Sequence, residues 1–411
     1  MVKPGYKQTE IGVIPEDWET SSLSAAFQKL EAGVSVNSDN SLSSEYHILK
    51  TSAVHDGVVD TAETKPVIPQ DYLRLKCPLV KGSIIISRMN TPALVGECGF
   101  TKDAKAGTYL PDRLWQIQNF NKSSFDFVWL NYLLNTKQYR DAVRATATGT
   151  SNSMKNISKE RMLDIEIPRP PINEQENIAA ALSEVDELIN LVEKQIDKKK
   201  AIKQGAMQEL LTGKRRLPGF AGEWKICRLD EIADFPTATI STDQFDNRFY
   251  VGTDNMIAYK GDVKYNELPL IYPKVRQYQT EDIILSNIRP YLQKIWYATR
   301  NGGCSNDVLV IRKKDGHAVE PKFLYYQLSR DGFYDEIMAN AVGTKMPRGD
   351  KAIVKSYRIN MPSDTAEQKA IASILSDADA EIKAMEEKLA KYRQIKQGMM
   401  QQLLTGKIRL V

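Results

Sequence analysis

The sequence predicts an α+β protein of two related halves, each with a globular domain followed by one long helix. The stretch from Ile202 to Lys214 recurs almost unchanged from Ile395 to Lys407, 193 residues further on in a chain of 411. A long run with helical periodicity leads into each copy. Short β-branched runs and amphipathic stretches precede each long run. Two homologous units therefore account for nearly the whole chain.

The two globular parts open alike and mix strands with short helices. A glycine, a tryptophan and a leucine recur at similar spacing: Gly12, Trp18 and Leu23, then Gly219, Trp224 and Leu229. β-branched runs predict strands at 83–87, 114–118 and 308–312, and amphipathic stretches predict helices at 125–134 and 321–328. The run 84–87 matches 283–286 in the other half. Each globular part is thus expected to be an α+β domain of roughly 130 to 150 residues, large enough for its own core.

The two long helices are predicted by apolar residues spaced four and three apart. These residues are Ile178, Leu182, Val185, Ile189, Val192 and Ile196 in the first copy, and Ile371, Leu375, Ala378, Ile382, Met385, Leu389 and Tyr392 in the second. Asn173 with Glu176, and Thr365 with Gln368, have the pattern of a capping box. Gly213 and Gly406 stand where a helix favours a left-handed final residue. About 38 residues give a rod of roughly 55 to 60 Å, and its apolar seam requires a helical partner.

Charge along the helices predicts how they pair. The range 174–193 has six acids and no base, whereas 194–216 has eight bases and two acids. The second copy repeats the trend, with six acids and two bases in 367–387 and six bases and no acid in 388–409. The helix dipole explains such a bias only in the first and last turns. Antiparallel packing sets acids against bases, so we expect an antiparallel coiled coil that relates the two domains by a pseudo-two-fold axis.

Composition excludes several classes of protein. No apolar run approaches the roughly 20 residues that cross a bilayer, and the N-terminus lacks an apolar signal segment, so we expect a cytoplasmic protein. The four cysteines and three histidines are scattered, which predicts free thiols and no metal site: Cys77, Cys98, Cys227 and Cys304, with His47, His55 and His317. The net charge of +4 is compatible with a nucleic-acid partner without implying one.

The sequence contains no motif typical of a catalytic or cofactor site. Thr212-Gly213-Lys214 and Thr405-Gly406-Lys407 are followed by Arg215 and Ile408, whereas a phosphate-binding loop needs serine or threonine there and a preceding strand. They are interpreted as glycine helix stops before a basic turn. No Gly-x-Gly-x-x-Gly fingerprint occurs. We therefore expect no enzymatic activity and no cofactor in this chain.

The whole chain resembles the DNA-specificity subunit of a type I restriction–modification system. The resemblance rests on the leader from Ile11 to Trp18, on the junctions Pro168 to Gln175 and Pro362 to Gln368, and on the two repeated helix endings. It implies two target-recognition domains and two conserved helical spacers. It also implies that two methyltransferase (modification) subunits dock on the spacers, that restriction (translocase) subunits complete the nuclease, and that the subunit itself is not catalytic. One departure is that Pro168 and Glu174 lie one residue further apart than Pro362 and Glu367.

The repeat and the resemblance together predict the domain boundaries. Residues 1–172 would form the first target-recognition domain and 173–214 the first spacer helix. Residues 215–362 would form the second domain and 363–411 the second helix. Each domain would read one half of a bipartite asymmetric site in double-stranded DNA.

Basic loops that bear glycine suggest where DNA is contacted. The range 339–358 has five bases and one acid, and 144–161 has four bases and one acid. Such loops suit phosphate contact and groove entry, although ordinary solvated lysines would look the same. Arg and Asn after the matched strands are the side chains that hold guanine and adenine edges, although arginines paired to acids are an equal alternative. The candidates are Arg88, Asn90, Asn152, Lys155, Asn287, Arg289, Lys345 and Arg348.

The apolar seams of the helices supply the candidates for partner binding. These are Ile178, Leu182, Leu210, Leu211, Ile371, Leu375, Leu403 and Leu404. An alternative function from another class is a coiled-coil adaptor that joins proteins without touching DNA. Salt-dependent DNA binding separates the two, because phosphate contacts release counterions and an adaptor makes none.

Overall fold

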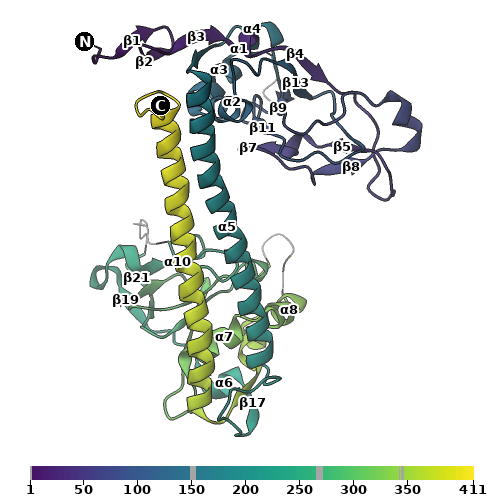
Figure 1. Ribbon diagram of the computed structural model, residues 1–411. Coiled ribbons are helices and arrows are strands. Elements are labelled where there is room, and N and C mark those ends of the chain that lie inside the picture. The colour runs from purple at the N-terminus through teal and green to yellow at the C-terminus, as the bar shows by residue number, and fades with distance from the viewer. Residues whose placement is uncertain (1, 149–153, 265–271, 342, 344–346) are drawn as a thin grey trace. The chain divides into compact units, whose positions relative to one another are not determined.

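The computed structural model describes residues 2–148, 154–264, 272–341, 343 and 347–411. The chain forms two compact units: the first joins Met1–Val192 to Lys388–Val411, and the second is the uninterrupted Glu193–Glu387. We call these the first unit and the second unit. Each contains one globular domain, a part of helix α5 (Ile172–Leu210) and a part of helix α10 (Thr365–Leu403) (Figure 1).

A six-stranded sheet organises the first globular domain. Its order is β4-β13-β9-β11-β7-β6, and every neighbouring pair is antiparallel except β7 with β11. The strands are β4 (Phe27–Ala32), β6 (Val54–His55), β7 (Gly57–Val59), β9 (Ile84–Ser87), β11 (Cys98–Phe100) and β13 (Leu114–Phe120). A smaller sheet, β12-β5-β8, contains β5 (His47–Leu49), β8 (Thr64–Pro66) and β12 (Thr108–Tyr109).

The other elements of the first domain connect and cover these sheets. The helices are α1 (Leu23–Ala26), α2 (Phe127–Leu134), α3 (Lys137–Ala145) and α4 (Lys159–Leu163), with 3-10 turns η1 (Thr51–Ala53) and η2 (Pro69–Arg74). The segment before α1, which includes the leader, contains β1 (Tyr6–Thr9), β2 (Gly12–Pro15) and β3 (Glu19–Ser22), and β3 pairs with β16 (Glu166–Arg169). A further small sheet consists of β10 (Met89–Asn90), β15 (Lys155–Ile157) and β14 (Ala147–Thr148).

The second globular domain uses two four-stranded sheets. The first, β18-β25-β22-β23, contains β18 (Ala233–Asp234), β22 (Ile283–Ser286), β23 (Ile295–Tyr297) and β25 (Val308–Lys313). The second, β19-β21-β24-β20, contains β19 (Thr239–Ser241), β20 (Tyr250–Val251), β21 (Lys274–Tyr278) and β24 (Gly302–Cys304). β17 (Trp224–Arg228) pairs with β26 (Arg358–Pro362). The helices are α6 (Leu229–Ile232), α7 (Pro321–Leu328), α8 (Asp331–Ala339) and α9 (Lys351–Ser356), with turns η3 (Thr242–Gln244), η4 (Asn247–Phe249) and η5 (Pro290–Leu292).

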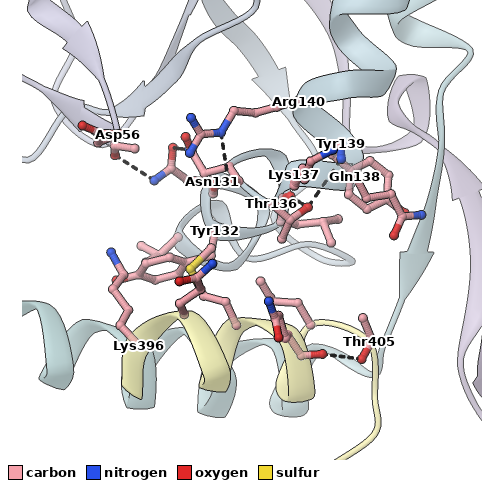
Figure 2. A pocket seen from close by; sticks show the side chains of 18 of the residues that line it. Asp56, Asn131, Tyr132, Thr136, Lys137, Gln138, Tyr139, Arg140, Lys396 and Thr405 are labelled. Carbon is pink, nitrogen blue, oxygen red and sulfur yellow. Dashed lines mark hydrogen bonds between the residues drawn. The ribbon is translucent and has the colours of Figure 1, made fainter. Parts of the chain in front are cut away.

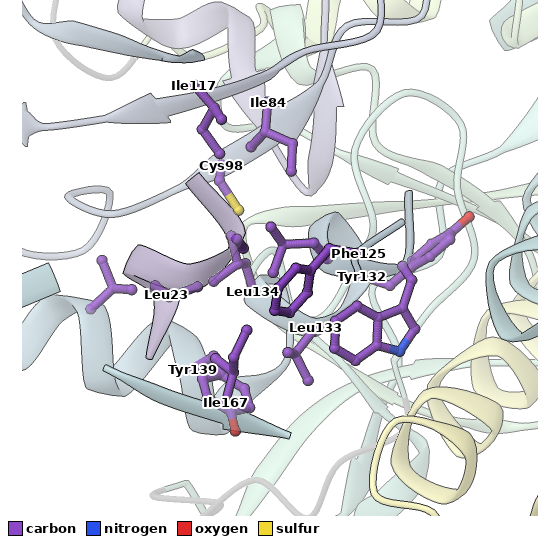
Figure 3. Packing of buried hydrophobic residues seen from close by; sticks show 14 of the residues in the cluster. Leu23, Ile84, Cys98, Ile117, Phe125, Tyr132, Leu133, Leu134, Tyr139 and Ile167 are labelled. Carbon is purple, nitrogen blue, oxygen red and sulfur yellow. The ribbon is translucent and has the colours of Figure 1, made fainter. Parts of the chain in front are cut away.

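The core of each unit includes residues of both long helices. In the first unit, Ile178 and Leu182 of α5 share a cluster with Leu403 and Leu404 at the end of α10, and Trp18 is fully buried in it. In the second unit, Leu210 and Leu211 share a cluster with Ile371 and Leu375 of α10. Figure 3 shows the part of the first core where side chains from α1, from α2 and the segment just before it, and from β16 meet: Leu23, Phe125, Leu133, Leu134 and Ile167. The predicted α+β class is confirmed in both units.

The long helices pack antiparallel, as their charge pattern predicts. In the first unit the carboxylate of Asp186 lies 2.6 Å from the ammonium of Lys396. In the second unit Lys199 pairs with Glu381 at 2.6 Å and Lys200 with Glu386 at 2.7 Å. Each pair joins the acidic half of one helix to the basic half of the other.

The predicted capping boxes are wrong, because both helices begin earlier than those patterns require. The Asp364 side chain, not Thr365, accepts a hydrogen bond from Ala366 N–H at 2.8 Å. In α5 the carbonyl of Pro171 accepts from the N–H groups of Glu174 and Gln175. The predicted glycine stops are confirmed, since Gly213 and Gly406 have φ of 74° and 70°. No helix in the described part of the chain is long and apolar enough to cross a membrane.

Candidate nucleic-acid interface

In the first unit, the segment after the central strand β9 lies against strand β15. β9 is buried along its whole length, and the chain leaves it at Arg88. The N–H of Arg88 donates to the carbonyl of Arg113 at 3.0 Å, and the carbonyl of Arg88 accepts from Ile157 N–H at 2.9 Å. Asn90 then pairs with Lys155 across the β10–β15 ladder. The structure thus brings together Arg88, Asn90 and Lys155, three of the side chains that the sequence singled out.

The second unit has the same backbone arrangement after strand β22. Asn287 N–H donates to the carbonyl of Asp307 at 2.9 Å, and the carbonyl of Asn287 accepts from Gly349 N–H at 2.9 Å. Arg289 N–H donates to the carbonyl of Pro347 at 2.8 Å, and Ile288 pairs with Arg348. The structure therefore gathers Asn287, Arg289 and Arg348 as it gathers the first group.

These matching hydrogen bonds define equivalent positions in the two units. Arg88 corresponds to Asn287, because each carbonyl accepts from the returning segment and each N–H donates across to the next strand. Asn90 corresponds to Arg289, the second residue after each of these positions. The two units thus carry an arginine and an asparagine in opposite order on one backbone frame.

Arg88 is held by a tryptophan ring and not by an acid. Its guanidinium carbon lies 5.5 Å from the centre of the Trp115 ring, a cation–π arrangement. Its Nε is buried and finds no acceptor in the described residues, and none of their ion pairs includes Arg88. Because Arg88 is only half-buried, the other N–H groups of its guanidinium can contact a ligand. Stacking on a ring orients the planar guanidinium, which favours bidentate recognition.

Asn90, the neighbouring candidate in the first unit, is more tightly held. The amide of Asn90 donates to Ser87 Oγ at 3.1 Å, and its oxygen accepts from Thr91 N–H at 2.8 Å. Those bonds shape the turn after β10 and leave Asn90 half-buried. Asn156, opposite Met89, has a buried side-chain oxygen without a hydrogen-bond donor among the described residues.

In the second unit, Arg289 and Arg348 differ in their partners. Arg289 is exposed, has φ of 51°, and takes part in none of the ion pairs found among the described residues. Arg348 lies 3.2 Å from the carboxylate of Asp307. Asn287 is half-buried, and a Cβ on Gly349 would approach its side-chain oxygen to 3.0 Å. Of the two interpretations left open, the acid-paired arginine applies to Arg348 and not to Arg88 or Arg289.

A basic group near this part of the second unit combines Lys351 and Lys355, which lie in the predicted basic range 339–358, with Arg276, which sequence reasoning missed. Burial, then the charges of Lys355 and Arg276, lower the pKa of Lys351. Mutual repulsion of this kind marks a concentration of positive charge, which an anion such as a phosphate would relieve. Only the fold brings Arg276 of β21 to α9, so no local pattern reveals the group. The predicted Asn152 and Lys345 lie outside the described residues.

The eight residues predicted to bind partners lie in the cores of the units. All are at most 5% exposed: Ile178, Leu182, Leu210, Leu211, Ile371, Leu375, Leu403 and Leu404. They pack on the chain's own globular domains, because the seam has to bury domain side chains as well as the other helix. The exposed apolar residues of the helices are others, namely Leu188, Leu191, Ile202, Ile374 and Ile395.

A cleft of about 980 Å³ in the first unit lies between α2, α3, the leader and the two long helices (Figure 2). At its edge, Tyr132 donates its hydroxyl hydrogen to Asp186 at 2.7 Å, and Lys396 lies over the Tyr132 ring. The second unit repeats this group, with Tyr326 donating to Asp379 at 2.8 Å and Lys203 over the ring. Burial raises the pKa of both tyrosines, so each remains a hydrogen-bond donor. These groups fasten the helices to the domains.

No side-chain cluster suited to catalysis emerges among the residues that the structure describes. They contain no group of three or more His, Cys, Asp or Glu side chains that could hold a metal ion. Burial raises the pKa of the Cys77, Cys98 and Cys304 thiols to about 12. A thiol that remains protonated at neutral pH is a poor nucleophile.

Comparison with known proteins gives one consistent family. The family model for the type I restriction modification DNA specificity domain matches residues 15–201 and 221–393. The putative type I restriction enzyme MjaX specificity subunit of Methanocaldococcus jannaschii is 26% identical, over 98% of this chain and 97% of that protein. The MjaVIII specificity subunit of the same organism is 24% identical, over 97% and 94%.

Two solved structures share the fold. The crystal structure of a type I restriction–modification S subunit from M. genitalium has a TM-score of 0.59 and 16% identity, and the match covers 94% of this chain and 96% of that one. A chain from a study of complex assembly and conformational transition of the type I system has a TM-score of 0.53 and 14% identity, with 96% and 99% covered.

Proposed function

The chain belongs to the family of type I restriction–modification DNA specificity proteins, and from this premise we propose that its domains read two different half-sites. It is a non-catalytic specificity subunit with two target-recognition domains. In our proposal each domain contacts one half of a bipartite asymmetric site in double-stranded DNA. The protein would act in the cytoplasm, where host DNA is found.

The observation that carries this proposal is the pair of equivalent segments after β9 and β22. One backbone frame presents Arg88 and Asn90 in the first unit, and Asn287 and Arg289 in the second. Arginine suits the acceptor edge of guanine and asparagine suits adenine. A shared frame with different side chains supports two readers of related geometry and unequal sequence.

Exposed residues of the long helices support the proposal that methyltransferase subunits dock there. Their exposed apolar side chains lie outside the chain's own cores, and large exposed apolar residues mark contact surfaces when they gather. The helix endings repeat almost verbatim, so equivalent surfaces occur twice. We propose that two methyltransferase subunits bind there and that restriction (translocase) subunits join the assembly.

Substitution of the proposed readers tests this function. The host's methylated motif is first identified by methylome sequencing with and without the gene. The protein, copurified with its methyltransferase subunit, should then protect two separated blocks of bases. Arg88→Lys keeps the positive charge but loses the planar fork, so we expect about ten- to hundredfold weaker discrimination in one half-site only. The log–log salt slope should stay unchanged, because phosphate neutralisation is the same.

Matched substitutions make the test specific. Arg289→Lys should relax the other half-site in the same way. Arg215→Gln is the control, since Arg215 lies in an exposed pair with Glu209 at the end of α5. A single continuous footprint, or equal losses in both half-sites from Arg88→Lys, would contradict the two-reader model. Salt-independent binding would favour the adaptor function.

A further inference from the structure

An equivalent hairpin in the two domains has a different turn in each. In the first unit β6 and β7 are joined by Asp56 and Gly57, with φ of 49° and 82°. In the second unit Met256 pairs with Val263, and the turn contains Tyr259 and Lys260, with φ of 59° and 63°. The hairpins correspond because Asp60 N–H donates to Ala53, and Lys264 N–H to Asn255, at 2.8 Å in both cases.

The second turn places bulky residues where small ones are favoured. Asp-Gly is a preferred pair for a tight turn with two left-handed residues, whereas tyrosine and lysine are strained there. Gly261 is the next residue, yet its φ is not in the left-handed region. Lys260 gains a partner, since its ammonium lies 2.6 Å from Asp331. Tyr259 is 71% exposed, and no hydrogen bond from its hydroxyl or contact of its ring occurs among the described residues.

The strained turn is held against the segment that follows Arg289. Tyr259 N–H donates to the carbonyl of Leu292 at 2.7 Å, and Lys260 N–H to that of Gln293 at 2.9 Å. Arg289 and Gln293, on either side of η5, are also left-handed. Four of the seven non-glycine residues with positive φ in the described chain thus meet here. Strained residues of this kind gather at binding sites, where function maintains them.

We propose that Tyr259 contacts DNA in the second target-recognition domain, as an aromatic wedge against a base step beside the bases that Arg289 reads. The turn between Arg289 and Gln293 presents a second exposed ring, that of Tyr291, which is 46% exposed. Rings and apolar side chains beside arginines are suited to base steps, because they can pack on bases that bending partly unstacks. DNA is the favoured occupant since the backbone of the turn that contains Tyr259 is hydrogen-bonded to the segment that follows Arg289, the proposed reader.

This inference rests on the proposed function and adds an asymmetry to it. The first unit has Asp56 at its equivalent turn, and a carboxylate there is unfavourable against DNA. Contact by a wedge would therefore belong to the second half-site alone.

Substitution of Tyr259 in the full chain, copurified with its methyltransferase subunit, tests the proposal. Tyr259→Asn removes the ring, and asparagine tolerates a left-handed backbone, so the fold should be kept. On duplex DNA carrying the methylated motif, we expect about five- to hundredfold weaker binding with an unchanged salt slope. The unfolding midpoint should be equal or higher. Tyr259→Phe should bind like the wild type, and Asp56→Asn is the matched control in the first unit.

The possible outcomes distinguish the proposed Tyr259 contact from the proposed function on which it rests. Wild-type affinity in Tyr259→Asn would overturn the wedge and leave the reader function intact. Weaker recovery of the methyltransferase subunit with unchanged DNA affinity would instead identify a protein contact and also overturn it. If the wild-type complex shows no site-specific, salt-dependent DNA binding, both the proposed function and the wedge fail.

Discussion

At the scale of single residues, buried carboxylates fasten the ends of the helix pair. The side chain of Glu174 is 1% exposed and accepts hydrogen bonds from Arg409 at 2.6 and 2.8 Å and from Trp18 Nε1 at 2.9 Å. In the second unit Glu367 accepts from Arg216 at 2.6 and 2.7 Å. These contacts give a physical reason for the tryptophan, Glu-Gln and helix-ending motifs that recur in the sequence.

Removal of the Arg409 charge is expected to destabilise the first unit. In Arg409→Gln the carboxylate of Glu174 stays buried without its cation, so we expect a loss of about 2 kcal/mol in the free energy of unfolding. Chemical denaturation of the full chain measures it. Arg215→Gln removes an exposed pair at the corresponding end of α5 and should have little effect. Equal effects of the two substitutions would show that burial of Glu174 is unimportant.

Arg409 also pairs with Asp17, at 2.7 Å, and this pair predicts how the stabilisation depends on pH. The hydrogen bond from Arg409 lowers the pKa of Asp17 below its ordinary value of 3.8. A carboxylate with a lowered pKa in the folded state stabilises that state above its ordinary pKa and loses this effect as pH falls through the lowered value. The difference in stability between wild type and Arg409→Gln should therefore shrink below pH 4. A difference that grows on acidification would contradict this assignment.

At the scale of elements, the sequence predicts regular structure better than contacts between distant segments. The predicted strands 83–87 and 308–312 correspond to β9 and β25, and the helix 321–328 is α7 as predicted. The long helices and their antiparallel packing follow from periodicity and charge, which are local properties. The pairing of Arg88 with Trp115 and of Asn90 with Lys155 depends on sheet order, which no local pattern contains. The seam residues lie in the cores of the units, and a periodic pattern does not say which surface it buries.

The helix pair also gives a prediction about spacing. Deletion of residues 191–197 from α5 and 385–391 from α10 removes seven residues at the same level, as judged from the Asp186–Lys396 and Lys203–Asp379 pairs. The seven-residue step keeps the apolar seam in phase and shortens the pair by about 10 Å, or roughly three base pairs. Methylome sequencing should show both half-sites intact with a shorter unread spacer. The same deletion in α5 alone should disrupt folding. An unaltered spacer would show that the helix pair does not set the distance between the two half-sites.

At the scale of the whole molecule, the first unit is assembled from both ends of the sequence. The Tyr6 hydroxyl donates to the carbonyl of Gly406 at 3.0 Å, and Asn177 donates to Leu410 at 3.0 Å. In the second unit the corresponding joint, from Gly213 to Trp224, is continuous chain. A Cβ on Gly406 would approach Trp18 to 3.1 Å and Pro15 to 2.5 Å, and one on Gly213 would approach Trp224 to 3.1 Å. In the first unit, contacts between the two ends of the chain thus take the place of the continuous chain that links Gly213 to Trp224 in the second unit.

A circular permutant is expected to keep this fold. The variant would open the exposed loop between Ala221 and Gly222 and join Val411 to Tyr6 through a short flexible linker. Because the glycine at each joint lies against the equivalent tryptophan, we expect a similar unfolding midpoint and the same two protected blocks on DNA. Loss of protection in the first half-site would show that the noncovalent contact between the two chain ends does more than close the first unit.

The discontinuity of the first unit also sets the order in which the protein can mature on the ribosome. All residues of the second unit exist once Glu387 has been made, whereas the first unit lacks residues 388–411 until these too have been translated. Until then Ile178 and Leu182 lack their core neighbours Leu403 and Leu404, and Glu174 lacks its ion pair with Arg409. The domain that the ribosome makes first is therefore the last to be completed.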